Sequence, residues 1–179
     1  MTVKEISEIS DLSGGARALV RDDSTPSSYL DSLEKQELFQ DAIRFLAHKL
    51  PTGAGVKWAA ACARELRAPD SKEQKDEPLD AVDQWIKTPG DPTRWAAKEA
   101  ADKAETTGPS NLAALAVFLS GGSVSPPGGP EIPPPEYAAQ KLIAGSVVVA
   151  VVSHEPQNAA ERYKHALKMG KEMDAPGNV

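Results

Sequence analysis

The sequence predicts an all-α protein of stacked helical hairpins, with about six to seven helices and one proline-rich strap. Apolar residues recur at helical spacing through most of the chain, and proline–glycine turns separate these stretches. Hydrophobic residues make up 40% of the 179 residues but aromatic ones only 5%. The core must therefore rely on close approach of alanine-rich helices. The predicted domain spans 34–173, after a flexible arm at 1–33 and before a frayed tail at 174–179.

The amino-terminal arm has the composition of loops. Ser13-Gly14-Gly15 and the stretch 22–28 contain turn-forming residues with little apolar periodicity. The short stretch 16–21 between them is compatible with a brief ordered element or a docking peptide. We expect a plain flexible arm over 1–33, because a segment with so little apolar periodicity has no clear face to bury.

The first predicted hairpin joins two amphipathic helices at a tight turn over 51–55. Its first helix covers roughly 33–50, and its apolar stripe consists of Phe39, Ile43, Leu46 and Leu50. Pro51 ends this helix, because the residue before a proline is pushed out of the helical region. The second helix covers roughly 55–67 and carries Trp58, Cys62 and Leu66 on one stripe. His48 falls on the polar side of the first helix, where we expect it to be solvated.

A second hairpin over 78–104 resembles the first. Asp91-Pro92 offers a capping carboxylate and a proline suited to a first helical turn, and Trp95 lies on the inner side of the following helix. The Asp-Ala pair at 41 recurs at 80 and Trp-Ala-Ala at 58 recurs at 95, offsets of 39 and 37 residues. These offsets are near the period of two-helix repeats. A genuine repeat and a chance likeness between alanine-rich helices both fit this pattern.

Further elements complete the predicted domain. The stretch 111–119 is apolar nearly all round and predicts a central buried helix. The strap at 124–135 has six prolines in the ten positions from Pro126. This composition favours an extended, polyproline-like strap over its own domain, with binding to a partner's groove as the alternative. The stretch 137–152 is helix or strand by composition, and we expect a helix because no second strand candidate exists to pair with it. Glu155-Pro156 begins a last helix.

Charge and hydropathy narrow the classes of partner. The formal net charge is −6, from 26 acidic and 20 basic residues. Such a surface repels phosphate backbones, so nucleic-acid binding is not expected. The longest largely apolar run, 142–152, is too short to cross a bilayer. The acidic start at 1–10 is unlike a signal peptide. We therefore expect a cytoplasmic protein without a membrane span.

The reactive side chains do not form a recognisable site in the sequence. Cys62 is the one cysteine, which excludes an intrachain disulfide and a cysteine-cluster zinc site, and we interpret it as a small buried thiol. The three histidines, His48, His154 and His165, do not have metal-ligand spacing. No nucleophile, phosphate-loop or dinucleotide motif is present. The sequence predicts no catalytic residue, no cofactor and no metal site, and thus no enzyme.

Four motifs, in order, carry a resemblance to a known family. They are Asp-Ala-Ile-Arg-Phe-Leu-Ala-His-Lys-Leu-Pro (41–51), Val-Lys-Trp-Ala-Ala (56–60), Trp-Ile-Lys-Thr-Pro (85–89) and Ala-Val-Phe-Leu-Ser-Gly-Gly-Ser (116–123). Over residues 35–170 the chain resembles a family of small uncharacterised bacterial proteins found beside type VI secretion components. The resemblance implies an accessory or adaptor role and assigns no catalytic residues.

Three functional hypotheses remain in order of preference. The first is a non-enzymatic, cytosolic helical adaptor of a bacterial secretion or contractile injection apparatus, which binds another protein through Trp58 and Trp95 or through the arm. The second is an immunity protein that neutralises a toxin, for which small size and acidic charge are suited. The third, least favoured, is an enzyme that uses His48 or His154.

Overall fold

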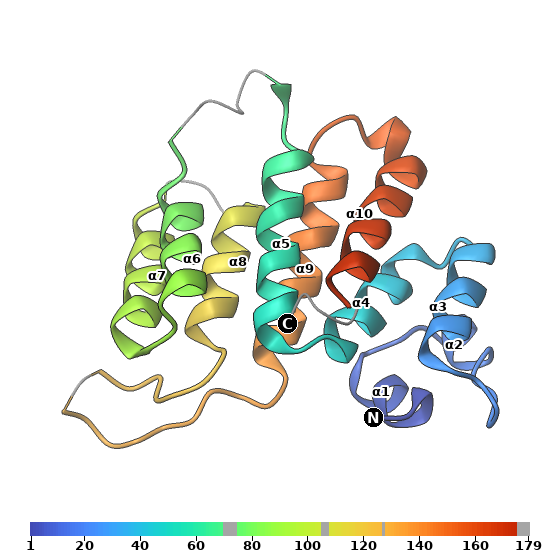
Figure 1. Ribbon diagram of the computed structural model, residues 1–179, viewed down its shortest axis with the longest axis horizontal. Coiled ribbons are helices and arrows are strands. Elements are labelled where there is room, and N and C mark those ends of the chain that lie inside the picture. Colours follow the sequence, from blue (N-terminus) through green and yellow to red (C-terminus); the bar gives the residue numbers. More distant parts are fainter. Residues whose placement is uncertain (70–74, 105–107, 127, 175–179) are drawn as a thin grey trace.

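The computed structural model describes residues 1–69, 75–104, 108–126 and 128–174 (Figure 1). In these residues the chain forms ten α-helices and no strand, which confirms the predicted all-α class. The helices are α1 Val3–Ile9, α2 Gly14–Arg17, α3 Pro26–Lys35, α4 Phe39–Lys49, α5 Thr52–Glu65, α6 Glu77–Lys87, α7 Asp91–Lys103, α8 Pro109–Phe118, α9 Ala138–Val152 and α10 Ala159–Met173, with a 3₁₀ turn, η2 Pro156–Asn158, before α10.

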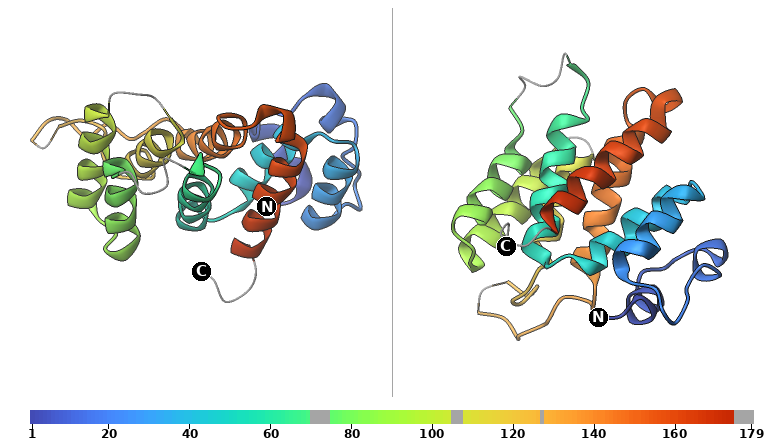
Figure 2. Two further views of the ribbon diagram at one scale, coloured as in Figure 1. Left: turned by 90° about the horizontal axis from the view of Figure 1, so that it is seen from above. Right: turned by 45° about the vertical axis from the view of Figure 1, so that its right-hand side comes forward.

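The molecule is elongated, with α6 and α7 at one end and α1 to α3 at the other (Figures 1 and 2). Between these ends, α9 packs against α4, α5, α8 and α10. The apolar α8 lies against α5, α6, α7 and α9, as expected for a helix without a polar face. The stretch 138–152 is a helix, as expected, although it is rich in β-branched residues. Tertiary burial on several sides outweighs the intrinsic preference of valine for strands.

The prediction of a flexible arm at 1–33 is wrong, because these residues form helices that pack onto the domain. A hydroxyl side chain caps each of the three short helices, namely Thr2, Ser13 and Thr25. Side chains from this region are buried, among them Val3, Ile6, Leu12, Ala16 and Tyr29. The Tyr29 hydroxyl donates to the Ala16 carbonyl at 2.8 Å. Helices this short show too few turns for their apolar face to be recognised as periodic.

Asp41 anchors this amino-terminal segment to α4. Its two carboxylate oxygens accept hydrogen bonds from the backbone N–H and the hydroxyl of Ser13, both at 2.8 Å. The long first helix expected at 33–50 is also interrupted. It divides into α3 and α4 at Glu37, whose φ of 56° is left-handed.

The two predicted hairpins pack differently. Helices α6 and α7 pack side by side along their length, as a helical hairpin does. Pro51 joins α4 to α5, but these two helices pack against α9 and α10 far more than against each other (Figure 2). The likeness in sequence between the two segments is therefore not a likeness in packing.

No helix in the described residues is both long and apolar enough to span a membrane. The frayed tail expected at 174–179 lies outside the described residues apart from Asp174, which forms an ion pair with Lys49.

Candidate functional site

Trp58, expected on a partner surface, is fully buried in the core. Its indole N–H donates to the Ala166 carbonyl at 2.8 Å. Its ring lies against Gly170, where an added Cβ would stand 2.7 Å from Cε2 of the indole. A glycine on α10 thus provides the space that the indole fills. Trp58 belongs to the contact between α5 and α10, and its assignment to a partner surface is wrong.

Trp95, the other predicted surface residue, is partly exposed and lines a groove of about 420 Å³. Its ring packs edge-on against Phe118, with centroids 5.0 Å apart. We name this groove the Trp95 groove. It lies between the start of α7 and the segment after α8, and its lining residues are Asp91, Pro92, Arg94, Trp95, Ser123, Ser125, Pro126, Gly128, Gly129 and Glu131.

The buried guanidinium of Arg94 holds the two sides of the Trp95 groove together. It donates to the carbonyls of Phe118 at 2.6 Å and Ser123 at 2.8 Å, and to the Asp91 carboxylate at 3.0 Å. These contacts tie the end of α8 and the following segment to α7. Gly122 passes the guanidinium with φ of 63°, and a Cβ there would lie 2.6 Å from an Arg94 nitrogen. Only glycine fits this conformation and this space.

Arg94 was not singled out in the sequence, and the role given to Asp91 needs correction. Gly90 is the N-cap of α7, while Asp91 lies inside the first turn and pairs with Arg94. The Ser-Gly-Gly-Ser stretch at 120–123 follows the end of α8 at Phe118. The sequence does not show that Arg94 binds the carbonyls of Phe118 and Ser123, because a buried arginine cannot be distinguished from an exposed one by local sequence.

The proline-rich segment folds back on itself and provides one wall of the groove. The Val124 N–H donates to the Ile132 carbonyl at 2.8 Å. The Ser123 hydroxyl oxygen accepts from the N–H groups of Ser125 and Ile132, at 3.1 and 3.0 Å. The expected extended strap is thus closed into a loop at this end, while Pro127 lies outside the described residues.

The charged side chains that the groove leaves exposed are acidic. Asp91 is 70% exposed and Glu131 is exposed as well. The cation of Arg94 is buried and fully engaged with its oxygen partners. The guanidinium carbon of Arg94 lies 5.8 Å from the centroid of the Trp95 ring. The exposed carboxylates of Asp91 and Glu131, which line the groove with Trp95, attract a further cation through charge.

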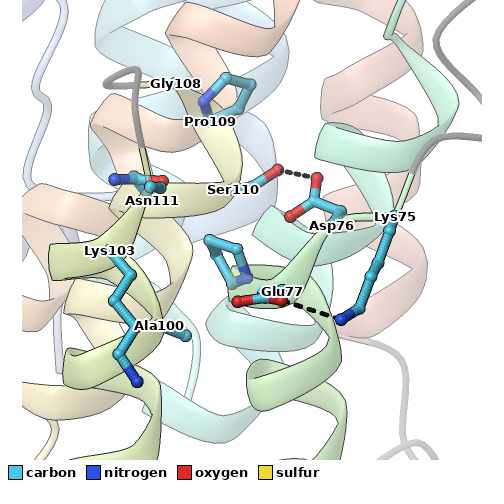
Figure 3. A pocket seen from close by; sticks show the side chains of 11 residues that line it. Lys75, Asp76, Glu77, Ala100, Lys103, Gly108, Pro109, Ser110 and Asn111 are labelled. Atoms are coloured by element: carbon cyan, nitrogen blue, oxygen red, sulfur yellow. Dashed lines mark hydrogen bonds and ion pairs between the residues drawn. The ribbon is translucent and has the colours of Figure 1, made fainter.

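A second, polar pocket of about 450 Å³ lies where the start of α6 meets the end of α7 and the start of α8 (Figure 3). Asp76 caps α6 by accepting from the Leu79 N–H at 3.1 Å, and it also accepts from the Ser110 hydroxyl at 2.6 Å. Arg67 forms an ion pair with the same carboxylate. Because its oxygens are occupied by these donors, Asp76 is a structural junction between three segments.

The three histidines lie apart. His48 is 4% exposed, contrary to the expected solvated position, because the turn after α1 and helix α9 cover that side of α4. Burial lowers the pKa of His48 below 6.5. His154 lines a different pocket, together with Arg67 and Asp76, and its Nε2 lies 3.8 Å from the Glu155 carboxylate. The Nε2 of His165 lies 2.6 Å from the Glu65 carboxylate.

Cys62 is buried, as expected, and burial raises the pKa of its thiol to about 12. The side chain is therefore an unreactive thiol at neutral pH. Among the described residues, no three or more His, Cys, Asp and Glu side chains gather closely enough to hold a metal ion.

The fold and the groove define an acidic, all-α protein with one partly exposed indole in a depression of its surface. The chain belongs to DUF6931, a family of unknown function whose model matches residues 29–174. This membership agrees with the resemblance to an uncharacterised family, and α1 and α2 lie before the matched region. A search of curated proteins and a search of solved structures find no match.

Proposed function

We propose that this protein is a non-enzymatic helical adaptor that binds another protein through the Trp95 groove. The observation that carries the proposal is the partly exposed indole of Trp95 in a preformed groove. Arg94 holds the walls of this groove together by donating hydrogen bonds to three acceptors. A rigid aromatic side chain in a preformed groove is the kind of residue that dominates binding energy in protein interfaces.

The chemistry of the groove favours an extended peptide segment that carries a lysine or arginine between apolar residues. The cation would lie over the indole of Trp95 and face the carboxylates of Asp91 and Glu131. The neighbouring prolines and glycines offer a surface with few charges to desolvate. The net charge of −6 adds long-range attraction for a basic segment.

Selection from a displayed library of random peptides tests this proposal. We expect the wild-type protein to enrich peptides with a basic residue flanked by apolar ones. Trp95→Ala should weaken binding of the selected peptides by about tenfold or more, and Glu131→Gln should weaken it less. Trp85→Ala is the matched control, because Trp85 is also partly exposed in the same hairpin but does not line the groove. Equal enrichment by the Trp95→Ala variant would refute the assignment.

The resemblance to proteins beside type VI secretion components suggests the setting of this adaptor. We propose a cytosolic role in which the basic segment belongs to a component or an effector of a secretion or contractile injection apparatus. The test is peptide binding by segments of the proteins encoded next to this one. If none of those segments binds while random basic peptides do, the Trp95 groove is still a peptide-binding site, but the proposed role in a secretion apparatus is rejected.

The acidic surface supports a second role, that of an immunity protein. An excess of six negative charges suits a protein that covers a basic toxin surface. Co-expression separates the two roles, since an immunity protein rescues cell growth from the toxin encoded beside it and an adaptor does not. The enzymatic alternative has less support, because His48 and His154 line different pockets.

A further inference from the structure

A small pocket of about 300 Å³ lies between the turn after α1, helix α4 and helix α9. It is separate from the Trp95 groove and shares none of its residues. The turn contributes Ser10 and Asp11, α4 contributes Arg44 and His48, and α9 contributes Lys141, Ala144, Gly145 and Val148. Apart from Lys141, the wall on α9 is built from small and apolar residues, whereas the other walls are polar.

His48 presents a buried hydrogen-bond acceptor without a partner. Its Nδ1 lies 2.9 Å from the carbonyl oxygen of Arg44 on the same helix. A carbonyl only accepts hydrogen bonds, so Nδ1 carries the proton. The pKa of His48 is lowered, chiefly by burial, so the ring is neutral at pH 7 and Nε2 keeps a free lone pair. This Nε2 atom is buried and has no hydrogen-bond partner among the described residues.

The pocket also exposes charges of both signs. Lys141 forms an ion pair with Asp11 at 2.9 Å, and Arg44 donates to the Asp11 carbonyl at 3.3 Å. The side chains of Lys141, Arg44 and Asp11 are 53%, 41% and 69% exposed. They are therefore accessible from solvent and retain donors and acceptors for a further partner. In contrast, His48 lines the pocket from α4 but is only 4% exposed.

We propose that this pocket binds a free α-amino acid. The ammonium group of the ligand would donate to Nε2 of His48 and to the Asp11 carboxylate, and its carboxylate would bind Lys141 and Arg44. A simple anion would bring lone pairs toward Nε2, and a simple cation would face Lys141 and Arg44. A zwitterion satisfies the acceptor and both signs of charge together. The pocket volume of about 300 Å³ leaves room for a compact ligand.

The experiment is an NMR titration of the full-length protein that follows the ring nitrogens of its three histidines. Each of the common amino acids is added in turn up to about 10 mM, a range that detects even weak binding. We expect at least one amino acid to shift the Nε2 signal of His48 and to raise the melting temperature, while the signals of His154 and His165 stay in place. The N-acetyl and the carboxamide derivatives of the same amino acid should not bind, because each lacks one of the two charges.

Two lysines provide a matched pair of variants. Lys141→Met should weaken binding about tenfold or more. Lys164→Met should leave it unchanged, although Lys164 is 52% exposed and forms a similar ion pair of 2.8 Å with Glu161. The proposal is overturned if no amino acid shifts the His48 signal, or if the N-acetyl derivative or the Lys141→Met variant binds equally well. The titration of the wild-type protein decides the question even if a variant does not fold.

Discussion

At the scale of single residues, Arg94 and Gly122 form the contact on which the Trp95 groove depends. The guanidinium is buried and binds two carbonyls, that of Phe118 at the end of α8 and that of Ser123 in the segment after it. Cations near the carboxyl end of a helix also interact favourably with its dipole. Gly122 admits this side chain because it has no Cβ and because it adopts a left-handed backbone conformation.

Gly122→Ala should therefore destabilise the protein by about 3 kcal/mol, from backbone strain and from a clash with Arg94. Gly121→Ala is the control, since a Cβ at Gly121 meets nothing within 4 Å and its φ is not left-handed. We expect that change to stay within about 0.5 kcal/mol. Urea unfolding of the two variants measures the difference, and equal midpoints would contradict this role of Gly122.

His48 makes stability depend on pH. Its pKa in the folded protein is lowered from 6.5, mainly by burial. Below that pH the unfolded chain takes up the proton before the folded protein does, so stability falls as the pH drops through 6.5. The slope reaches at most about 1.4 kcal/mol per pH unit.

His48→Gln should flatten this slope between about pH 7 and pH 5.5 in urea unfolding. An unchanged slope in His48→Gln would show that other groups are responsible.

At the scale of helices, small residues determine how closely the elements approach. Gly170 on α10 faces Trp58 on α5 and Leu46 on α4, and a Cβ would come within 2.7 Å of both side chains. Gly53 lies near the start of α5, where a Cβ would meet nothing within 4 Å.

The same substitution should therefore have opposite effects at these two helical positions. Gly170→Ala should cost about 2 kcal/mol through overpacking, while Gly53→Ala should stabilise by up to about 1 kcal/mol through helix propensity. Thermal and urea unfolding provide the comparison. Stabilisation by Gly170→Ala would mean that α5 and α10 are less closely packed than described.

Elements with a strong pattern were predictable, and short ones were not. Helix α6 follows from its apolar stripe, and α8 follows from its continuous apolar run. Helices α1 and α2 span only two turns or fewer. Helix α1 is buried by packing against α4, and α2 is held by hydrogen bonds to Asp41 and Tyr29, which lie outside both helices. The packing of α4 and α5 on α9 instead of on each other is likewise a tertiary property that local pattern does not contain.

At the scale of the whole molecule, the amino-terminal segment is part of the folded unit. Ile6 is 1% exposed and belongs to the same core as α4. Ile6→Ala should cost about 3 kcal/mol, because a large buried side chain is removed. Lys4→Ala, on the exposed side of the same helix, should have little effect. Equal stability of the two variants would instead support the prediction of a flexible arm at 1–33.

The candidate site was only partly predictable for the same physical reason. Trp58 and Trp95 occupy the same Trp-Ala-Ala pattern, and both were expected at a partner surface. Gly170 and the Ala166 carbonyl, more than a hundred residues away in the chain, bury the first. The second remains partly exposed because the segment after α8 forms a groove beside it. Sequence near each tryptophan does not contain this difference.

The most direct test of the proposed function follows the three indole N–H signals by NMR while a selected basic peptide is added. The signal of Trp95 should shift and saturate with the peptide. The signals of Trp58, whose N–H is bound to the Ala166 carbonyl, and of Trp85 should remain in place. A peptide that binds while the Trp95 signal stays unchanged would place the interaction elsewhere and contradict the account.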